Sequence, residues 1–135
     1  MEETLYDKAT HNLKIAELII KEATDDEAYL NYAGYHLQQA VELSIKFVLE
    51  ENGIEYPYTH DITQLIYACK ENNVSDGFTD YVDEHSEMFT IWESKTRYVT
   101  NYNLEAEKVK RAAKEVEAQL ELIQINYIKI QGKDV

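Results

Sequence analysis

Apolar residues recur along this chain in steps of three and four, which is the spacing of an amphipathic helix. The first such stripe predicts a helix over residues 4–23. It consists of Leu5, Ala9, Leu13, Ala16, Ile20 and Ala23. No segment alternates apolar and polar residues for long enough to predict a strand. The pattern therefore predicts an all-α fold.

A second helix is predicted over residues 24–53. Residues 24–27 have the spacing of a capping box at its start, and Gly53 is expected to end it in a left-handed conformation. Two apolar stripes follow its length. They consist of Leu30, Leu37, Val41 and Val48, and of Ala33, Ala40, Leu43 and Phe47. A helix that is apolar on two faces packs on two sides, so we expect this helix to be the long central element of a bundle.

Two shorter helices are expected next. Pro57 interrupts the helical pattern, so the third helix is expected to start at residues 59–61 and to end at residues 72–73. A fourth helix is expected to present one continuous apolar face. That face consists of Phe78, Val82, His85, Phe89, Trp92 and Thr96.

The last predicted helix begins after Asn103, which is expected to cap it. Its stripe consists of Val109, Ala112, Val116, Leu120, Ile123 and Tyr127. The whole pattern predicts one domain over residues 1–128, an up-and-down bundle of four to five helices joined by short loops. Residues 129–135 are expected to form a loosely held tail.

The amino-acid composition indicates the cellular compartment in which the protein is expected to work. The 135 residues include a single cysteine, Cys69, which cannot form an internal disulfide. No apolar run reaches the length of a membrane span, and the acidic N-terminus lacks the layout of a signal peptide. These features favour a cytoplasmic protein without a membrane segment. We expect neither a cofactor nor a metal, because no histidine has the Glu-x-x-His spacing of carboxylate-bridged metal bundles.

The charge is strongly negative but unevenly distributed. The chain carries −13 overall, which disfavours binding to duplex nucleic acid by bulk electrostatics. Residues 95–114 instead carry a net charge of +4. This stretch is either a solvated helix face or a local phosphate-binding patch, with Arg97, Tyr98, Lys108 and Arg111 as the candidate ligand-binding residues.

Two polar segments interrupt the helical pattern and are expected to meet. Gln38, Gln39 and Glu42 lie on the otherwise buried second helix, and a buried polar group needs a partner. Arg97 lies where the fourth helical pattern ends, and its guanidinium suits either a phosphate or an ion pair with Glu42. His60, at the start of the third helix, is expected to join this polar layer as a capping or packing residue. Ligand binding and structural pairing are both open as roles of Arg97.

Tyrosine is unusually frequent, with 11 residues in the chain. Tyr29, Tyr32 and Tyr35 cluster on the first half of the second helix. Tyrosine is enriched at protein interfaces, so this cluster is a candidate contact surface. The alternative is a rim of the core with the hydroxyl groups in water.

These segments resemble the HEPN domain, a family named for nucleotide binding in higher eukaryotes and prokaryotes. Residues 33–49 resemble the family's QAxEKxLKxLL helix, and residues 60–65 resemble its H-[DS]-[IL]-xx-L motif. Residues 97–98 are similar to the ARYP element, and residues 108–123 to the final helix of the family. The resemblance covers roughly residues 5–125. It implies a bundle of four or five helices, often a homodimer, that acts beside a minimal nucleotidyltransferase in toxin–antitoxin pairs or as an accessory subunit.

Other members of that family are metal-independent ribonucleases with an Arg-x4–6-His motif. Here no histidine follows Arg97 at that spacing, and Tyr102 stands in its place. A phenol, with a pKa of about 10, is a poor base at neutral pH compared with an imidazole. We therefore expect a non-catalytic module that binds a nucleotide, an RNA or a partner protein. The alternatives are a divergent ribonuclease toxin that uses Arg97 and Tyr102, and a purely structural homodimer.

Overall fold

The computed structural model describes residues 2–23 and 26–128. This part of the chain is helical and contains no strand, which confirms the predicted all-α class. Its elements are α1 (Leu5–Glu22), α2 (Tyr29–Glu51), α3 (Ile62–Glu71), α4 (Asp80–Glu84), α5 (Ser86–Tyr98), α6 (Ala106–Ile123) and the short π-helix η1 (Gln124–Ile128). The tail expected over residues 129–135 lies outside the described residues.

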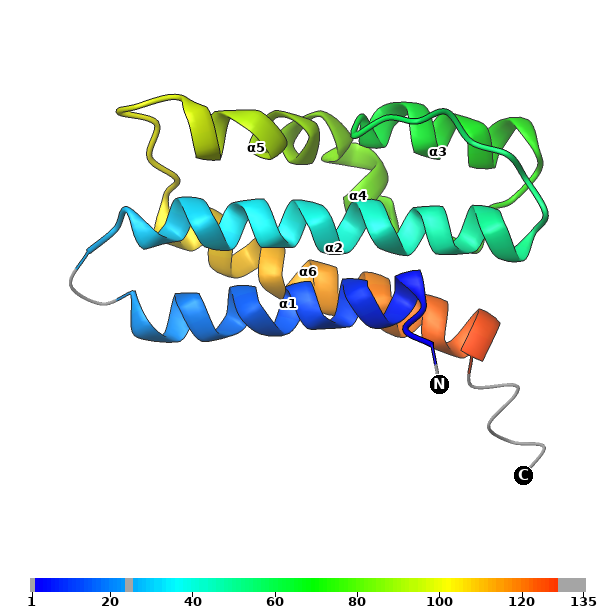
Figure 1. Cartoon of the computed structure of the whole chain (residues 1–135), viewed down its shortest axis with the longest axis horizontal. Helices are drawn as coiled ribbons and strands as arrows, with labels where there is room; N and C mark the ends of the chain where they lie inside the picture. Colours follow the sequence, from blue (N-terminus) through cyan, green and yellow to red (C-terminus); the bar gives the residue numbers. More distant parts are fainter. Residues whose placement is uncertain (1, 24–25, 129–135) are drawn as a thin grey trace.

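Helix α2 occupies the centre of the bundle, as its two apolar stripes predict (Figure 1). Helices α3 and α5 lie end to end along one side of α2, and α1 and α6 lie on the other side. Helix α1 runs antiparallel to α2, and so does α5. The up-and-down arrangement expected from the short connections is therefore present.

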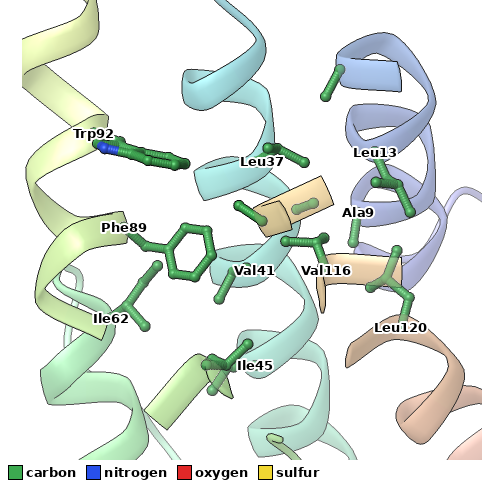
Figure 2. Close-up of a cluster of buried hydrophobic side chains, with 14 of the residues drawn as sticks. Ala9, Leu13, Leu37, Val41, Ile45, Ile62, Phe89, Trp92, Val116 and Leu120 are labelled. Atoms are coloured by element: carbon green, nitrogen blue, oxygen red, sulfur yellow. The ribbon is translucent and has the colours of Figure 1, made fainter. Parts of the chain in front are cut away.

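The core surrounds α2 on both sides (Figure 2). Leu37, Val41 and Ile45 of α2 are fully buried. The side chains that pack around them come from all the long helices, and they include Ala9, Leu13, Ile62, Phe89, Trp92, Val116 and Leu120. Burial of one large aliphatic side chain contributes about 1.5–3 kcal/mol. Two-sided burial thus fixes the long helix in place and gives its polar side chains defined positions.

The two ends of α2 differ in how well the sequence predicts them. The helix begins at Tyr29 rather than at residue 24, because the backbone first makes a turn in which Asp26 Oδ1 accepts a hydrogen bond from the Ala28 N–H at 2.9 Å. Residues 24–25, the first half of the expected capping box, lie outside the described residues. At the other end Gly53 follows the helix with a φ of +68°, as predicted for a left-handed stop.

The prediction of a single fourth helix is wrong, because the chain forms two helices, α4 and α5, with a break at His85. This residue has φ −108° and ψ 18°, outside the α-helical region. Its Nδ1 lies 2.8 Å from the Tyr81 carbonyl oxygen, and its ring stacks on the Tyr81 ring with the centroids 3.9 Å apart. These local contacts hold the break while the apolar face continues across it.

The prediction that Asn103 caps the last helix is also wrong. Helix α6 begins two residues later than a cap at Asn103 predicts, with Glu105 at its N-cap and no side-chain cap. The reason is Leu104, which is buried and whose N–H donates to Asn31 Oδ1 at 3.1 Å. Leu104 packs against Gly34 of α2, where a Cβ atom would collide with its side chain. Leu104 therefore packs into the core before the helix starts.

Candidate functional site

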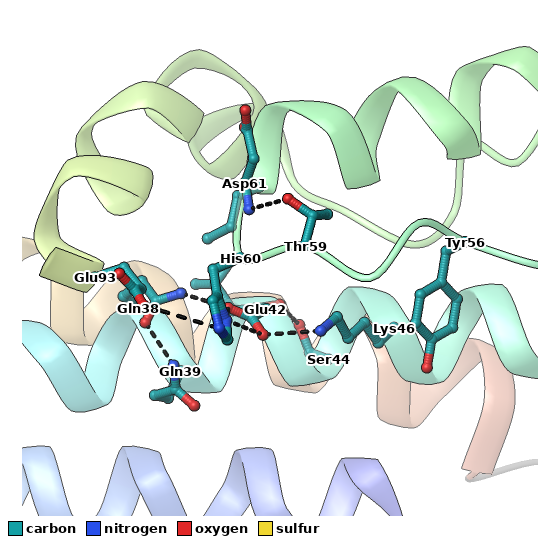
Figure 3. A network of polar contacts seen from close by, with 12 residues as sticks. Gln38, Gln39, Glu42, Ser44, Lys46, Tyr56, Thr59, His60, Asp61 and Glu93 are labelled. Carbon is teal, nitrogen blue, oxygen red and sulfur yellow. Dashed lines mark hydrogen bonds and ion pairs between the residues drawn. The ribbon is translucent and has the colours of Figure 1, made fainter.

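A buried carboxylate, Glu42 of α2, organises the polar layer (Figure 3). Its side chain is 3% exposed. One oxygen accepts a hydrogen bond from Gln38 Nε2 at 2.7 Å and the other from Lys46 Nζ at 3.0 Å, while His60 Nδ1 lies 3.1 Å from both. Gln39 extends the layer by donating to Gln38 Oε1 at 2.8 Å. The structure thus brings together all four residues of the expected polar layer and adds Lys46.

Helical spacing and one extended segment build this layer. Gln38, Glu42 and Lys46 follow one another at intervals of four residues, so their side chains share one face of α2. His60 reaches the same face from the segment between α2 and α3, next to Asp61, which caps α3. In the described part of the chain every buried side-chain nitrogen and oxygen has a hydrogen-bond partner. A buried carboxylate is tolerated under this condition.

Arg97, in the last turn of α5, is held by Glu93 and not by Glu42. Its Nε donates to the Glu93 carbonyl oxygen at 2.8 Å, and its NH2 lies 2.8 Å from Glu93 Oε1. Its Cζ lies 4.6 Å from the ring centroid of Tyr35 and 4.7 Å from that of Tyr98, within the range of cation–π contacts. The ion pair between Arg97 and Glu42 that the sequence suggested is not formed, because Glu42 is already occupied by three other donors.

The two polar segments nevertheless belong to one site. His60 Nε2 lies 3.9 Å from Glu93 Oε1, so the imidazole stands between two carboxylates. Basic and acidic groups therefore alternate along a row, which we call the Arg97 row. It consists of Lys46, Glu42, His60, Glu93 and Arg97. The His60 side chain is 55% exposed and the Arg97 side chain 30%, so the row is reached from solvent at its middle and at one end.

Glu93 belongs to this site although it was not among the residues predicted from the sequence. A signal existed, because Glu93 precedes Arg97 by four residues on a predicted helix, and this spacing allows an ion pair. The position of Tyr35 beneath Arg97 had no such signal, since it depends on how α5 packs against α2.

The other candidate residues lie away from the Arg97 row. Tyr102 and Lys108 line a groove between α5 and the start of α6, together with Trp92. Arg97 is five residues beyond Trp92 and therefore lies about 140° further around α5. Arg111 lines a separate groove between α1 and α6. The expected phosphate patch is thus divided among three places, and no hydrogen bond joins Arg97 to Tyr102 among the described residues.

Residues 2–23 and 26–128 contain no group of three or more His, Cys, Asp or Glu side chains that could hold a metal ion. No helix in the same residues is long and apolar enough to cross a membrane.

Cys69 is buried on α3, and burial raises the pKa of its thiol to about 11. The thiolate that would act as a nucleophile is therefore disfavoured at neutral pH.

The fold is an all-α bundle with a buried polar layer, and comparison with known families shows to which class of helical bundle it belongs. A family model described as the HEPN domain matches residues 2–126, which is nearly the whole chain. The chain belongs to the HEPN domain family, and it is accordingly a nucleotide- or RNA-related helical module. No significant match was found among curated proteins or among solved structures.

Proposed function

We propose that this HEPN protein is a non-catalytic module that binds a nucleotide or an RNA end at the Arg97 row. The observation that carries the proposal is the separation of Arg97 from Tyr102, which stands where the ribonuclease motif has its histidine. Tyr102 lines the groove between α5 and α6, and no hydrogen bond joins it to Arg97 among the described residues. A phenol in a different groove is poorly placed to act with the Arg97 guanidinium on one phosphate.

The surroundings of Arg97 support a binding role. A guanidinium close to two tyrosine rings offers donors for phosphate and flat surfaces for a nucleobase. Tyr98 is 72% exposed, so its ring has a face available for stacking. Tyr102, the other candidate catalytic residue, lines a different groove, which weighs against the alternative of a ribonuclease that uses Arg97 and Tyr102.

The same proposal includes a protein partner. The resemblance to HEPN proteins that accompany a minimal nucleotidyltransferase suggests an accessory or toxin–antitoxin role in the cytoplasm, with the protein as a homodimer. Tyr29 and Tyr32 are more than half exposed on α2 and provide an amphipathic surface for such contacts. Size-exclusion chromatography with light scattering tests the dimer, and co-purification with a nucleotidyltransferase encoded beside it tests the partner.

An RNA-cleavage assay in the presence of EDTA tests the absence of catalysis. We expect no cleavage by the wild-type protein at neutral pH. Cleavage that persists in EDTA and disappears in Arg97→Ala would instead identify a metal-independent ribonuclease and overturn the proposal.

A binding titration tests the recognition role. We expect labelled single-stranded RNA or a nucleotide to bind the wild-type protein, and Arg97→Ala to weaken that binding. Lys95→Ala is the matched control, because Lys95 is an exposed cation in the same helix turn and forms no ion pair with a described residue. Equal binding by wild type and Arg97→Ala, together with a dimer, would leave the structural homodimer as the better description.

A further inference from the structure

A groove between α1 and α6 gathers basic side chains on a chain that is otherwise acidic. Its volume is about 490 Å³. Four cationic side chains line it, and they are Lys21, Lys110, Arg111 and Lys114. Lys21 comes from the last turn of α1, so the cluster includes a residue about 90 positions before the others in the sequence. Two carboxylates, Glu17 and Glu107, also line the groove, which leaves cations in excess.

The lysines of this groove are not held in ion pairs with the described residues. Among the ion pairs of residues 2–23 and 26–128, none involves Lys21, Lys110 or Lys114. Arg111 is anchored, with its Nε 3.4 Å from Glu115 Oε2 and its Cζ 5.5 Å from a tyrosine ring centroid. The groove therefore has one cation with a partly exposed ion-pair partner and three lysine ammonium groups available to a ligand. In this respect it differs from the Arg97 row, in which each charge has a partner.

We propose that this groove binds a compact polyphosphate, either free or as the phosphate chain of a nucleotide. Lysine ammonium groups are compact donors that suit phosphate oxygens. The chain as a whole carries −13, so a long polyanion that extends beyond the groove meets repulsion from the acidic surface. A ligand shorter than the screening length of about 8–10 Å interacts mainly with the local cations. This balance favours a small, densely charged anion over a nucleic acid.

The shape of the groove is consistent with that ligand. Its volume of about 490 Å³ is in the range of small-molecule sites. Ile20 and Ala113 contribute apolar surface between the cations, and the methylene groups of the lysines extend it. A nucleobase could rest on this surface while its phosphates contact the lysines. The site is separate from the Arg97 row, so the inference does not depend on the proposed function.

Isothermal titration calorimetry of the full chain tests the site with two probes, inorganic tripolyphosphate and ATP, at an ionic strength of about 0.15 M. The test variant is the double substitution Lys110→Ala/Lys114→Ala. The control is Lys8→Ala/Lys95→Ala, which makes the same change in net charge at exposed helical positions outside the groove. Alanine favours helix, so both variants are expected to fold. We expect affinity for both probes to fall about tenfold in the groove variant, and less than about twofold in the control.

The pattern of binding identifies the source of the phosphates. Equal affinity for the two probes supports a free polyphosphate as ligand, and tighter binding of ATP supports a nucleotide whose base uses the apolar surface. The proposal is overturned if neither probe binds, or if the groove and control variants lose affinity equally. It is also overturned if a 20-nucleotide RNA binds the groove more tightly than ATP, because the site would then be a nucleic-acid surface.

Discussion

Separate alanine substitutions at Glu42 and Arg97 distinguish the structural part of the polar site from its exposed end. In Glu42→Ala the buried carboxylate is lost, and Lys46, whose side chain is 13% exposed, keeps a charge without its partner. Gln38 Nε2, which is fully buried, also loses its acceptor. Breaking a buried pair by removing one member costs about 3–5 kcal/mol, so we expect a loss of that size in the free energy of unfolding.

In Arg97→Ala the expected loss is smaller. The ion pair with Glu93 is partly exposed, and such a pair contributes at most about 1 kcal/mol. Cation–π contacts with Tyr35 and Tyr98 add about 0.5–1 kcal/mol at an exposed position. The carboxylate of Glu42 keeps all its hydrogen-bond donors in this variant. We therefore expect a total loss of about 0.5–2 kcal/mol.

Urea unfolding followed by far-UV circular dichroism measures both losses on the same scale. If Glu42→Ala does not fold, Glu42→Gln keeps the side-chain volume and still removes the charge opposite Lys46, and it is expected to be less stable than Arg97→Ala. A loss in Arg97→Ala equal to or larger than that in the Glu42 variants would refute the reasoning. It would mean that Arg97, and not His60 and Lys46, stabilises the buried carboxylate.

Three further predictions concern single side chains. Burial lowers the pKa of His36, whose Nδ1–H donates to Asn12 Oδ1 at 2.7 Å, so the unfolded chain binds more protons than the folded chain near and below the ordinary pKa of about 6.5. We expect stability to fall as the pH drops below that value, and urea titrations at pH 7 and pH 5 should show a smaller decrease in His36→Gln. Cys69 should react with a thiol reagent only after urea unfolding, because burial raises its pKa to about 11; rapid reaction of the native protein would contradict this. Gly34→Ala should lower the melting temperature by several degrees, because the new Cβ displaces Leu104 from the core, and an unchanged value would show that this packing is loose.

Most of the fold follows from the apolar pattern, because the long helices bury one or two continuous stripes. The break at His85 could not be predicted in this way. The apolar face continues across the break with the same spacing, so α4 and α5 share a pattern with one longer helix. The late start of α6 has a different origin, since Asn103 is a favoured capping residue but Leu104, which follows it, occupies a core position. At the start of α6 a tertiary contact therefore overrides a local signal, whereas the break at His85 is held by local contacts with Tyr81.

The polar site was only partly predictable. A polar cluster on a buried helix indicates that partners exist, and this was sufficient to group Gln38, Glu42 and His60. It does not indicate which carboxylate pairs with Arg97, because Glu42 across the bundle and Glu93 in the same helix both offer an acceptor. Glu93, on the same helix as Arg97, is the nearer acceptor at 2.8 Å. An i,i+4 pair within one helix forms without any long-range closure, which explains why it replaces the interhelical pair.

The two basic regions differ in whether their cations are already held in ion pairs, and this difference affects how each region binds an anion. A phosphate that approaches Arg97 must compete with the Glu93 carboxylate, which already lies 2.8 Å from the guanidinium. No such carboxylate holds Lys110 or Lys114 among the described residues. A small anion should therefore prefer the groove between α1 and α6, where no existing ion pair has to be broken. Binding at the Arg97 row then depends on additional contacts, and a base stacked on Tyr98 or a protein surface that supplies such contacts would make the row selective for a larger ligand.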